Sequence, residues 1–245
     1  ATKEKSVIIA DTGGTSYDVS LVREGRIPWT RETWLGQRFR GHMTGFPSVD
    51  VKSIGAGGGS IAWVDAGGLL HVGPQSAGSS PGPVCYDSGG TEPTVTDCAL
   101  ALGFIDPSFF LGGAMKLNEV KAKDAIETKV GKILKITTEE AAHAVLALAT
   151  EKMVGAIEEI TVNQGIDPKS ACLIGGGGAA GLNANAVAKR LGCSKAIIPN
   201  VGAALSAAGA LMSDLSAEFP KISFTSGKDF EFNKINTVLK SLTEQ

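Results

Sequence analysis

The sequence predicts an α/β protein in which an antiparallel strand meander is followed by parallel strands with flanking helices. Two observations lead to this prediction. Short apolar runs separated by glycine turns occupy the first part of the chain, and helical patterns alternate with short apolar runs from residue 118 onward. The 245 residues, 43% hydrophobic and 20% charged, are typical of a globular protein with one large domain or two small ones.

The first part of the chain contains the strands of the meander. Apolar runs that predict strands lie at residues 6–10, 17–22, 27–34, 61–64 and 69–72. Glycine turns join the first three, so we expect them to pair antiparallel. Val49 and Val51 alternate into Ile54. The last two runs flank Asp65-Ala66-Gly67-Gly68, which is typical of a hairpin.

A long segment rich in turn residues follows the hairpin. Residues 76–96 contain four serines, four glycines and three prolines. Loops of this length inside a domain are usually functional or mobile. Because the segment also carries the apolar Val84, Cys85 and Tyr86, we expect an ordered loop and not a linker.

The remainder alternates helix and strand. Asn118 can cap a helix that reaches Val130 and ends at Gly131, and Thr137 and Glu140 form a capping box for a long helix. The elements predicted after the first of these helices are helix 138–164, strand 171–174, a helix reaching 191, strand 196–198 and helix 203–215. We expect residues 1–216 to form a nucleotide-binding core and residues 217–245 to begin an incomplete C-terminal extension.

Charge and cysteine content exclude several classes of function. Lys and Arg number 23 against 25 Asp and Glu, which gives no basic field for nucleic acid or an anionic membrane. The four cysteines are scattered, which suits neither a zinc site nor a disulfide framework. With no apolar run of about 18 residues and no signal peptide, we expect a soluble, cytoplasmic protein.

The sharpest motif is a glycine turn between the first two predicted strands. It reads Asp11-Thr12-Gly13-Gly14-Thr15, with Asp18 three residues further on. Glycines let backbone amides approach phosphate oxygens, and threonine hydroxyls add donors. A carboxylate at the start of such a turn suits Mg²⁺ bound through water. The alternative is a plain turn with local side-chain bonds.

The second motif is a strand–glycine–helix junction, Gly175 to Gly181. It includes Gly176, Gly177, Gly178 and Ala179, and a helix N-terminus there suits a nucleotide. Gly176-x-Gly178-x-x-Gly181 also has the dinucleotide spacing, but no carboxylate stands about twenty residues on. Close packing is the alternative. A third run, residues 55–60, is equally compatible with an anion-binding nest and with a bent strand end against another backbone.

Several stretches occur in an order that identifies a family. They are DTGGTSYDVSLV (11–22), SIGAGGGSIAWVDAGGLLHV (53–72), GPQSAGSSPG (73–82), GTEPTVTDCALAL (90–102), ITVNQGIDP (160–168), and the segment from Gly177 through Pro199 to residues 204–215. Together they resemble the hydantoinase A / 5-oxoprolinase / acetone carboxylase family, within the actin-like ATPase and sugar-kinase superfamily.

This resemblance implies an ATP-dependent enzyme that phosphorylates an oxygen of a cyclic amide or ketone substrate. It implies that residues 11–15 contact the phosphates and Mg²⁺, with Asp11 as the catalytic residue, and that residues 176–179 face the adenosine. A B-type companion subunit would hold a metal-dependent second half-reaction. The family's first phosphate motif lies upstream of these stretches, so the chain resembles the C-terminal part of the core, and another chain or segment would carry that motif.

One departure from the family and two other classes of function bear on this interpretation. Where members commonly read Gly-Gly-Ala-Gly-Pro-Leu-His, this chain has Gly177-Gly178-Ala179-Ala180-Gly181-Leu182-Asn183, which leaves a role for that histidine unsupported. An NAD-binding oxidoreductase domain would use the junction for a dinucleotide. A non-catalytic ATPase-like regulatory subunit would bind nucleotide without substrate-stimulated turnover.

Overall fold

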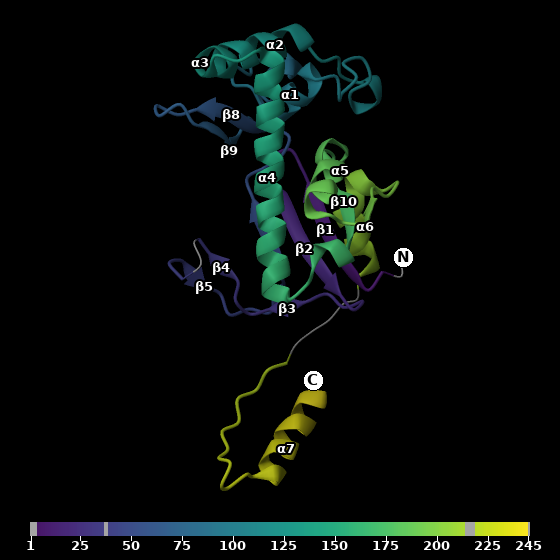
Figure 1. The fold of residues 1–245 in the computed structure, drawn as a ribbon. Helices are drawn as coiled ribbons and strands as arrows, with labels where there is room; N and C mark the ends of the chain where they lie inside the picture. The colour runs from purple at the N-terminus through teal and green to yellow at the C-terminus, as the bar shows by residue number, and fades with distance from the viewer. Residues whose placement is uncertain (1–3, 37–38, 214–218, 245) are drawn as a thin grey trace. The chain divides into compact units, whose positions relative to one another are not determined.

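The computed structural model describes residues 4–36, 39–213 and 219–244 (Figure 1). The chain divides into two compact units, Ala1–Ala208 and Gly209–Gln245. The first unit contains the main sheet, and the second contains helix α7 (Phe232–Thr243). Within the described ranges, no helix is both long enough and apolar enough to cross a membrane.

A mixed five-stranded sheet forms the centre of the first unit, in the order β11-β10-β1-β2-β7. Its middle strand β1 (Ser6–Thr12) runs parallel to β10 (Cys172–Gly176) and antiparallel to β2 (Tyr17–Arg23). The outer strands are β7 (Val51–Ile54) and β11 (Lys195–Ile197). The predicted α/β class, with antiparallel strands first and parallel strands later, is therefore confirmed.

The predicted strand at residues 27–34 is wrong. That stretch contributes only to two short ladders outside the main sheet: β3 (Trp29–Thr30) with β6 (Ser48–Val49), and β4 (Trp34–Leu35) with β5 (His42–Met43). Arg23 and Arg26 close a turn directly after β2, and Pro28 has no amide hydrogen to donate to a neighbouring strand. The third strand of the meander is instead β7, which pairs antiparallel with β2.

The predicted hairpin and long helix are both present. Strands β8 (Ser60–Val64) and β9 (Leu70–Ser76) pair antiparallel. Helix α4 (Thr138–Gln164) begins at the Thr137–Glu140 capping box and ends at Gly165 in the left-handed conformation. Its length lets it pack against two separate clusters, because one end lies with α1 and the hairpin and the other lies against the main sheet (Figure 1).

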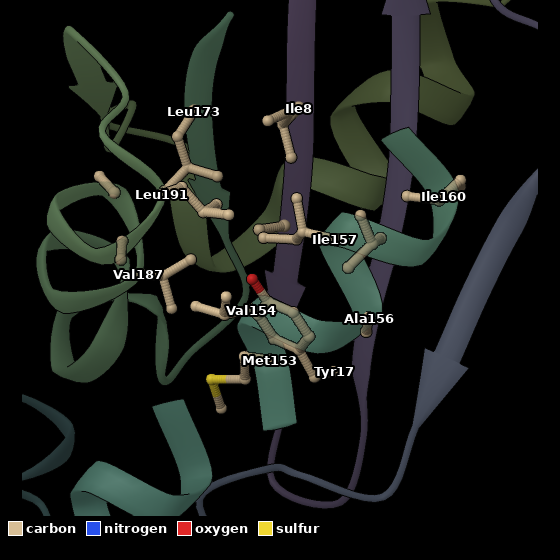
Figure 2. Close-up of a cluster of buried hydrophobic side chains, with 14 of the residues drawn as sticks. Ile8, Tyr17, Met153, Val154, Ala156, Ile157, Ile160, Leu173, Val187 and Leu191 are labelled. Atoms are coloured by element: carbon tan, nitrogen blue, oxygen red, sulfur yellow. The ribbon is translucent and has the colours of Figure 1, made fainter. Parts of the chain in front are cut away.

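The core beside the main sheet is drawn in Figure 2. Met153 and Ile157 of α4 belong to one buried cluster with Tyr17 of β2 and side chains of α5 (Ala180–Leu191), among them Val187. All four side chains are buried, and each contributes about 1.5–3 kcal/mol by the area removed from water. Burial also raises the pKa of the Tyr17 hydroxyl. This cluster fixes α4 and α5 on one face of the sheet.

The remaining helices differ from prediction in their bounds. Helix α1 (Val95–Ala101) lies partly inside the predicted loop. Helix α2 (Glu119–Ile126) begins at the predicted cap Asn118 but does not stop at Gly131, since it continues through a π turn into α3 (Lys132–Leu134). Helix α6 (Leu205–Met212) is shorter than predicted, and residues 214–215 of that prediction lie outside the described residues.

Candidate phosphate-binding site

The turn between β1 and β2 holds the predicted phosphate motif. The Gly13 amide closes the turn by donating to the Ser16 carbonyl at 3.1 Å. Asp11 is paired with Asp18 in the antiparallel ladder, and directly paired residues point to the same side of a sheet. Successive residues point to opposite sides, so these two carboxylates lie on the face away from α4 and α5.

Thr12 points to the helix-covered face and is 1% exposed. Its hydroxyl donates to Asn183 Oδ1 of α5 at 3.2 Å, and its carbonyl accepts from the Ala179 amide at 3.0 Å. The hydroxyl thus ties β1 to α5 and is not presented at the open side of the turn. Asn183, which stands where the resembled family commonly has histidine, therefore has a structural partner in this chain.

The Asp11 carboxylate is held on two sides. Ser206, at the start of α6, donates its hydroxyl to Asp11 Oδ2 at 2.5 Å. On the other side lies Gly177, whose φ is +83°, and a Cβ at that position would overlap Asp11 Oδ1 and the Thr12 carbonyl oxygen. Only glycine permits this approach. Ser206 lies in the stretch 204–215 that resembles the family, but no sequence feature singles it out, and its role is visible only from its distance to Asp11.

Few amides of the two predicted loops are free. The Gly177 amide donates to the Gly202 carbonyl at 2.8 Å, and that of Ala179 is used by Thr12. A Cβ on Gly176 would meet Leu205 Cδ2 at 2.7 Å, so that glycine serves packing. Gly14 and Gly178 differ, because their amides have no acceptor among the described residues and a Cβ on either would meet nothing within 4 Å.

The third glycine run, residues 55–60, packs against the turn between β1 and β2 and donates hydrogen bonds to it. The amides of Gly58 and Gly59 donate to the carbonyls of Gly13 and Gly14 at 3.0 and 2.6 Å, and the Gly57 amide donates to Ser60 Oγ. These amides are occupied, so the run is the bent strand end packed on another backbone and not an anion-binding nest. It leaves the outer side of the Gly13–Gly14 turn open.

The long loop after β9 is ordered by a buried carboxylate. Asp97, fully buried at the start of α1, accepts hydrogen bonds from the amides of Val84, Cys85 and Thr94 and from the Thr94 hydroxyl. At the other end of the loop, Ser76 Oγ lies 3.3 Å from Thr15 Oγ1. Asp97 thereby fixes a loop that borders the phosphate turn, although the sequence motifs do not single it out.

One histidine and two cysteines outside the predicted motifs have structural surroundings. His71 stacks on Trp63 with ring centroids 4.4 Å apart, and its Nε2 lies 2.7 Å from Asp65 Oδ2. Burial raises the pKa of the thiols of Cys85 and Cys98, which keeps them protonated and unreactive at neutral pH. Among the described residues, no group of three or more His, Cys, Asp and Glu could hold a metal by itself.

The mixed sheet, the glycine turn between its first two strands and the strand–glycine–helix junction beside them define the actin-like ATPase class of fold. The solved structure of ATP-dependent caprolactamase from Pseudomonas jessenii has this arrangement, with a TM-score of 0.80 and 38% sequence identity. That match covers 99% of this chain and 35% of the other.

The family model described as hydantoinase/oxoprolinase matches residues 1–219, and the chain belongs to this family. The caprolactamase alpha subunit of Pseudomonas jessenii is 43% identical over 210 residues, which cover 86% of this chain and 30% of the relative. The acetophenone carboxylase gamma subunit of Aromatoleum aromaticum is 45% identical over 176 residues, 71% of this chain and 24% of the relative. The chain thus spans about a third or less of these relatives.

Proposed function

We propose that this chain supplies one half of an ATP site that phosphorylates a carbonyl oxygen of a cyclic amide or a ketone. The observation that carries the proposal is that the two glycine loops lie side by side, joined by the hydrogen bond from the Ala179 amide to the Thr12 carbonyl. Each loop holds one glycine with open surroundings, Gly14 or Gly178, and the first loop connects the strands that pair Asp11 with Asp18. For a cyclic amide, phosphorylation of the oxygen makes the carbonyl carbon a better target for hydrolysis. For a ketone, phosphorylation would activate the enolate and bicarbonate for formation of the new C–C bond.

The residues present fit a nucleotide phosphate. Backbone amides of glycine turns bind phosphate oxygens, and Gly14 and Gly178 are the glycines outside the helix in these two motifs where an added Cβ would meet nothing within 4 Å. A helix N-terminus beside Gly178, that of α5, adds a favourable dipole. Residues 176–179 as a group would then border the nucleotide where the phosphates join the adenosine, with Gly178 making the direct approach to the phosphate.

The carboxylates fit Mg²⁺. Like charges directly opposite one another on paired strands are destabilising, and a divalent cation near Asp11 and Asp18 would offset this repulsion. Mg²⁺ prefers oxygen ligands and keeps several waters, which suits a site with few protein ligands. Asp11 would hold the ion through water, while Asp18 is oriented by the Ser16 hydroxyl at 2.8 Å. The ion would neutralise charge on the phosphate oxygens during transfer.

The same proposal includes two protein partners. A segment or chain with the first phosphate motif would close the nucleotide site from the other side, and a B-type subunit would carry out the second half-reaction. The names of the relatives, an alpha subunit and a gamma subunit, support a multisubunit assembly. In this proposal residues 1–216 are the nucleotide-binding core, residues 217–245 begin an extension, and the assembly is cytoplasmic.

Calorimetry on the protein purified from its source, with the polypeptides that co-purify, tests the proposal. Wild type should bind ATP with Mg²⁺ more tightly than without it, and Asp11→Asn should abolish that difference while leaving the thermal unfolding midpoint within a few degrees. Asp106→Asn, an exposed carboxylate bonded only locally, is the matched control and should behave as wild type. Equal Mg²⁺ dependence in wild type and Asp11→Asn would overturn the assignment of Asp11.

A further inference from the structure

Among the described residues, a hydroxyl outside the two glycine motifs contacts Asp11, the carboxylate proposed to hold Mg²⁺. Ser206 Oγ lies 2.5 Å from Asp11 Oδ2, although 195 residues separate the two in the chain. A hydroxyl–carboxylate bond of this length is charge-assisted and stronger than a neutral hydrogen bond. Because Gly177 borders the other carboxylate oxygen, Oδ1, the two contacts together restrict rotation of the Asp11 side chain.

This bond is not needed to dock the helix that carries it. Leu205 packs where Gly176 lacks a side chain, and the Gly202 carbonyl accepts from the Gly177 amide at 2.8 Å. These two contacts hold the start of α6 and the residues just before it against the glycine junction without the Ser206 hydroxyl. Ser206 itself is exposed, so removing its hydroxyl leaves no buried group unsatisfied.

We propose that Ser206 is a positioning residue that fixes the Asp11 carboxylate for Mg²⁺·ATP. The proposal rests on the function proposed above. Its hydroxyl donates to Oδ2 and restricts the orientation of the carboxylate, which would keep the remaining lone pairs available to the water shell of a bound ion. Without the hydroxyl, Asp11 keeps its charge but samples other rotamers, and the ion and its nucleotide bind to a smaller fraction of the protein.

Nucleotide binding measured as a function of Mg²⁺ separates this role from a structural one. In the source-purified assembly, Ser206→Ala should raise the Mg²⁺ concentration for half-maximal ATP binding about tenfold, the loss expected for one hydrogen bond to a charged group. ATP binding in EDTA and the thermal unfolding midpoint should not change. Ser206→Thr keeps the hydroxyl on an exposed position and should restore wild-type Mg²⁺ dependence.

The control is another serine that donates to a carboxylate. Ser108 Oγ lies 2.7 Å from Asp106 Oδ1 in an exposed loop, and Ser108→Ala should leave ATP binding unaltered. Equal weakening with Mg²⁺ and with EDTA, no weakening, or failure of Ser206→Thr to rescue would each overturn the positioning role. If wild type itself shows no Mg²⁺-dependent ATP binding, the proposed function falls as well, which distinguishes the two failures.

Discussion

Replacing Gly177 with alanine should destabilise the protein far more than the same change one residue later. Gly177 has φ +83°, and its missing Cβ would overlap the Thr12 carbonyl oxygen and Asp11 Oδ1. A non-glycine residue in this region costs about 1–2 kcal/mol, and forcing extra atoms into a packed site costs about 1–3 kcal/mol. The two effects predict a loss of about 2–5 kcal/mol from a total stability of about 5–15 kcal/mol.

Gly178→Ala is the matched comparison. A Cβ there meets nothing within 4 Å and the backbone is not left-handed, so the stability should change by less than about 1 kcal/mol. Urea unfolding followed by circular dichroism measures both variants, and calorimetry measures their ATP affinity. Gly178→Ala should weaken ATP binding while remaining folded. Equal stability of wild type and Gly177→Ala would refute the assigned packing role.

Two further predictions concern elements around the site. Asp97→Ala should lower the free energy of unfolding by about 3 kcal/mol or more, because it leaves buried amide donors without an acceptor. It should also make the loop at 76–94 sensitive to proteolysis. The control Asp106→Ala, at an exposed position, should have neither effect. Hydrogen bonds from the amide and then the side chain of Thr137 lower the pKa of Glu140. The ionised Glu140 carboxylate therefore stabilises the folded protein above its unfolded-state pKa, and this stabilisation is lost as pH falls through its folded-state pKa. Glu140→Gln keeps the capping box without the charge, so the difference in unfolding free energy between wild type and this variant should become smaller at acidic pH. A difference that stays constant between pH 7 and pH 3 would contradict this.

Local patterns predicted the elements whose signals are themselves local. The turn between β1 and β2 and the capped helix α4 were readable because glycine spacing, a capping box and a buried face are encoded within one segment. The strand that pairs with β2 could not be predicted from the sequence. The nearest downstream apolar run, at residues 27–34, pairs elsewhere, and the true partner β7 begins about thirty residues after β2 ends. Helix α1 was missed because serine, glycine and proline around it concealed the Thr94–Asp97 capping box.

The side-chain contacts that shape the site join residues far apart in the sequence, and no sequence motif predicts them. Thr12 meets Asn183 across 171 residues, and Asp11 meets Ser206 across 195. A serine in a helix of small residues and an asparagine after a glycine run are common in any sequence. Neither residue could therefore be predicted to contact the site without the tertiary structure. The sequence could predict the glycine turn that we propose binds phosphate, but the groups that contact its carboxylate depend on the tertiary fold.

The glycines themselves provide the strongest argument for the proposed nucleotide site. Gly57 packs against the turn backbone, Gly176 against Leu205 and Gly177 against Asp11, so side-chain crowding explains why each is glycine. Among the loop glycines of the two predicted motifs, crowding does not explain Gly14 or Gly178, whose surroundings are open and whose backbone φ is ordinary for any residue. An exposed glycine without a packing reason costs backbone entropy. A molecule that approaches both amides closely would supply that reason, and the paired carboxylates beside them favour one that arrives with a cation, as a nucleotide phosphate does.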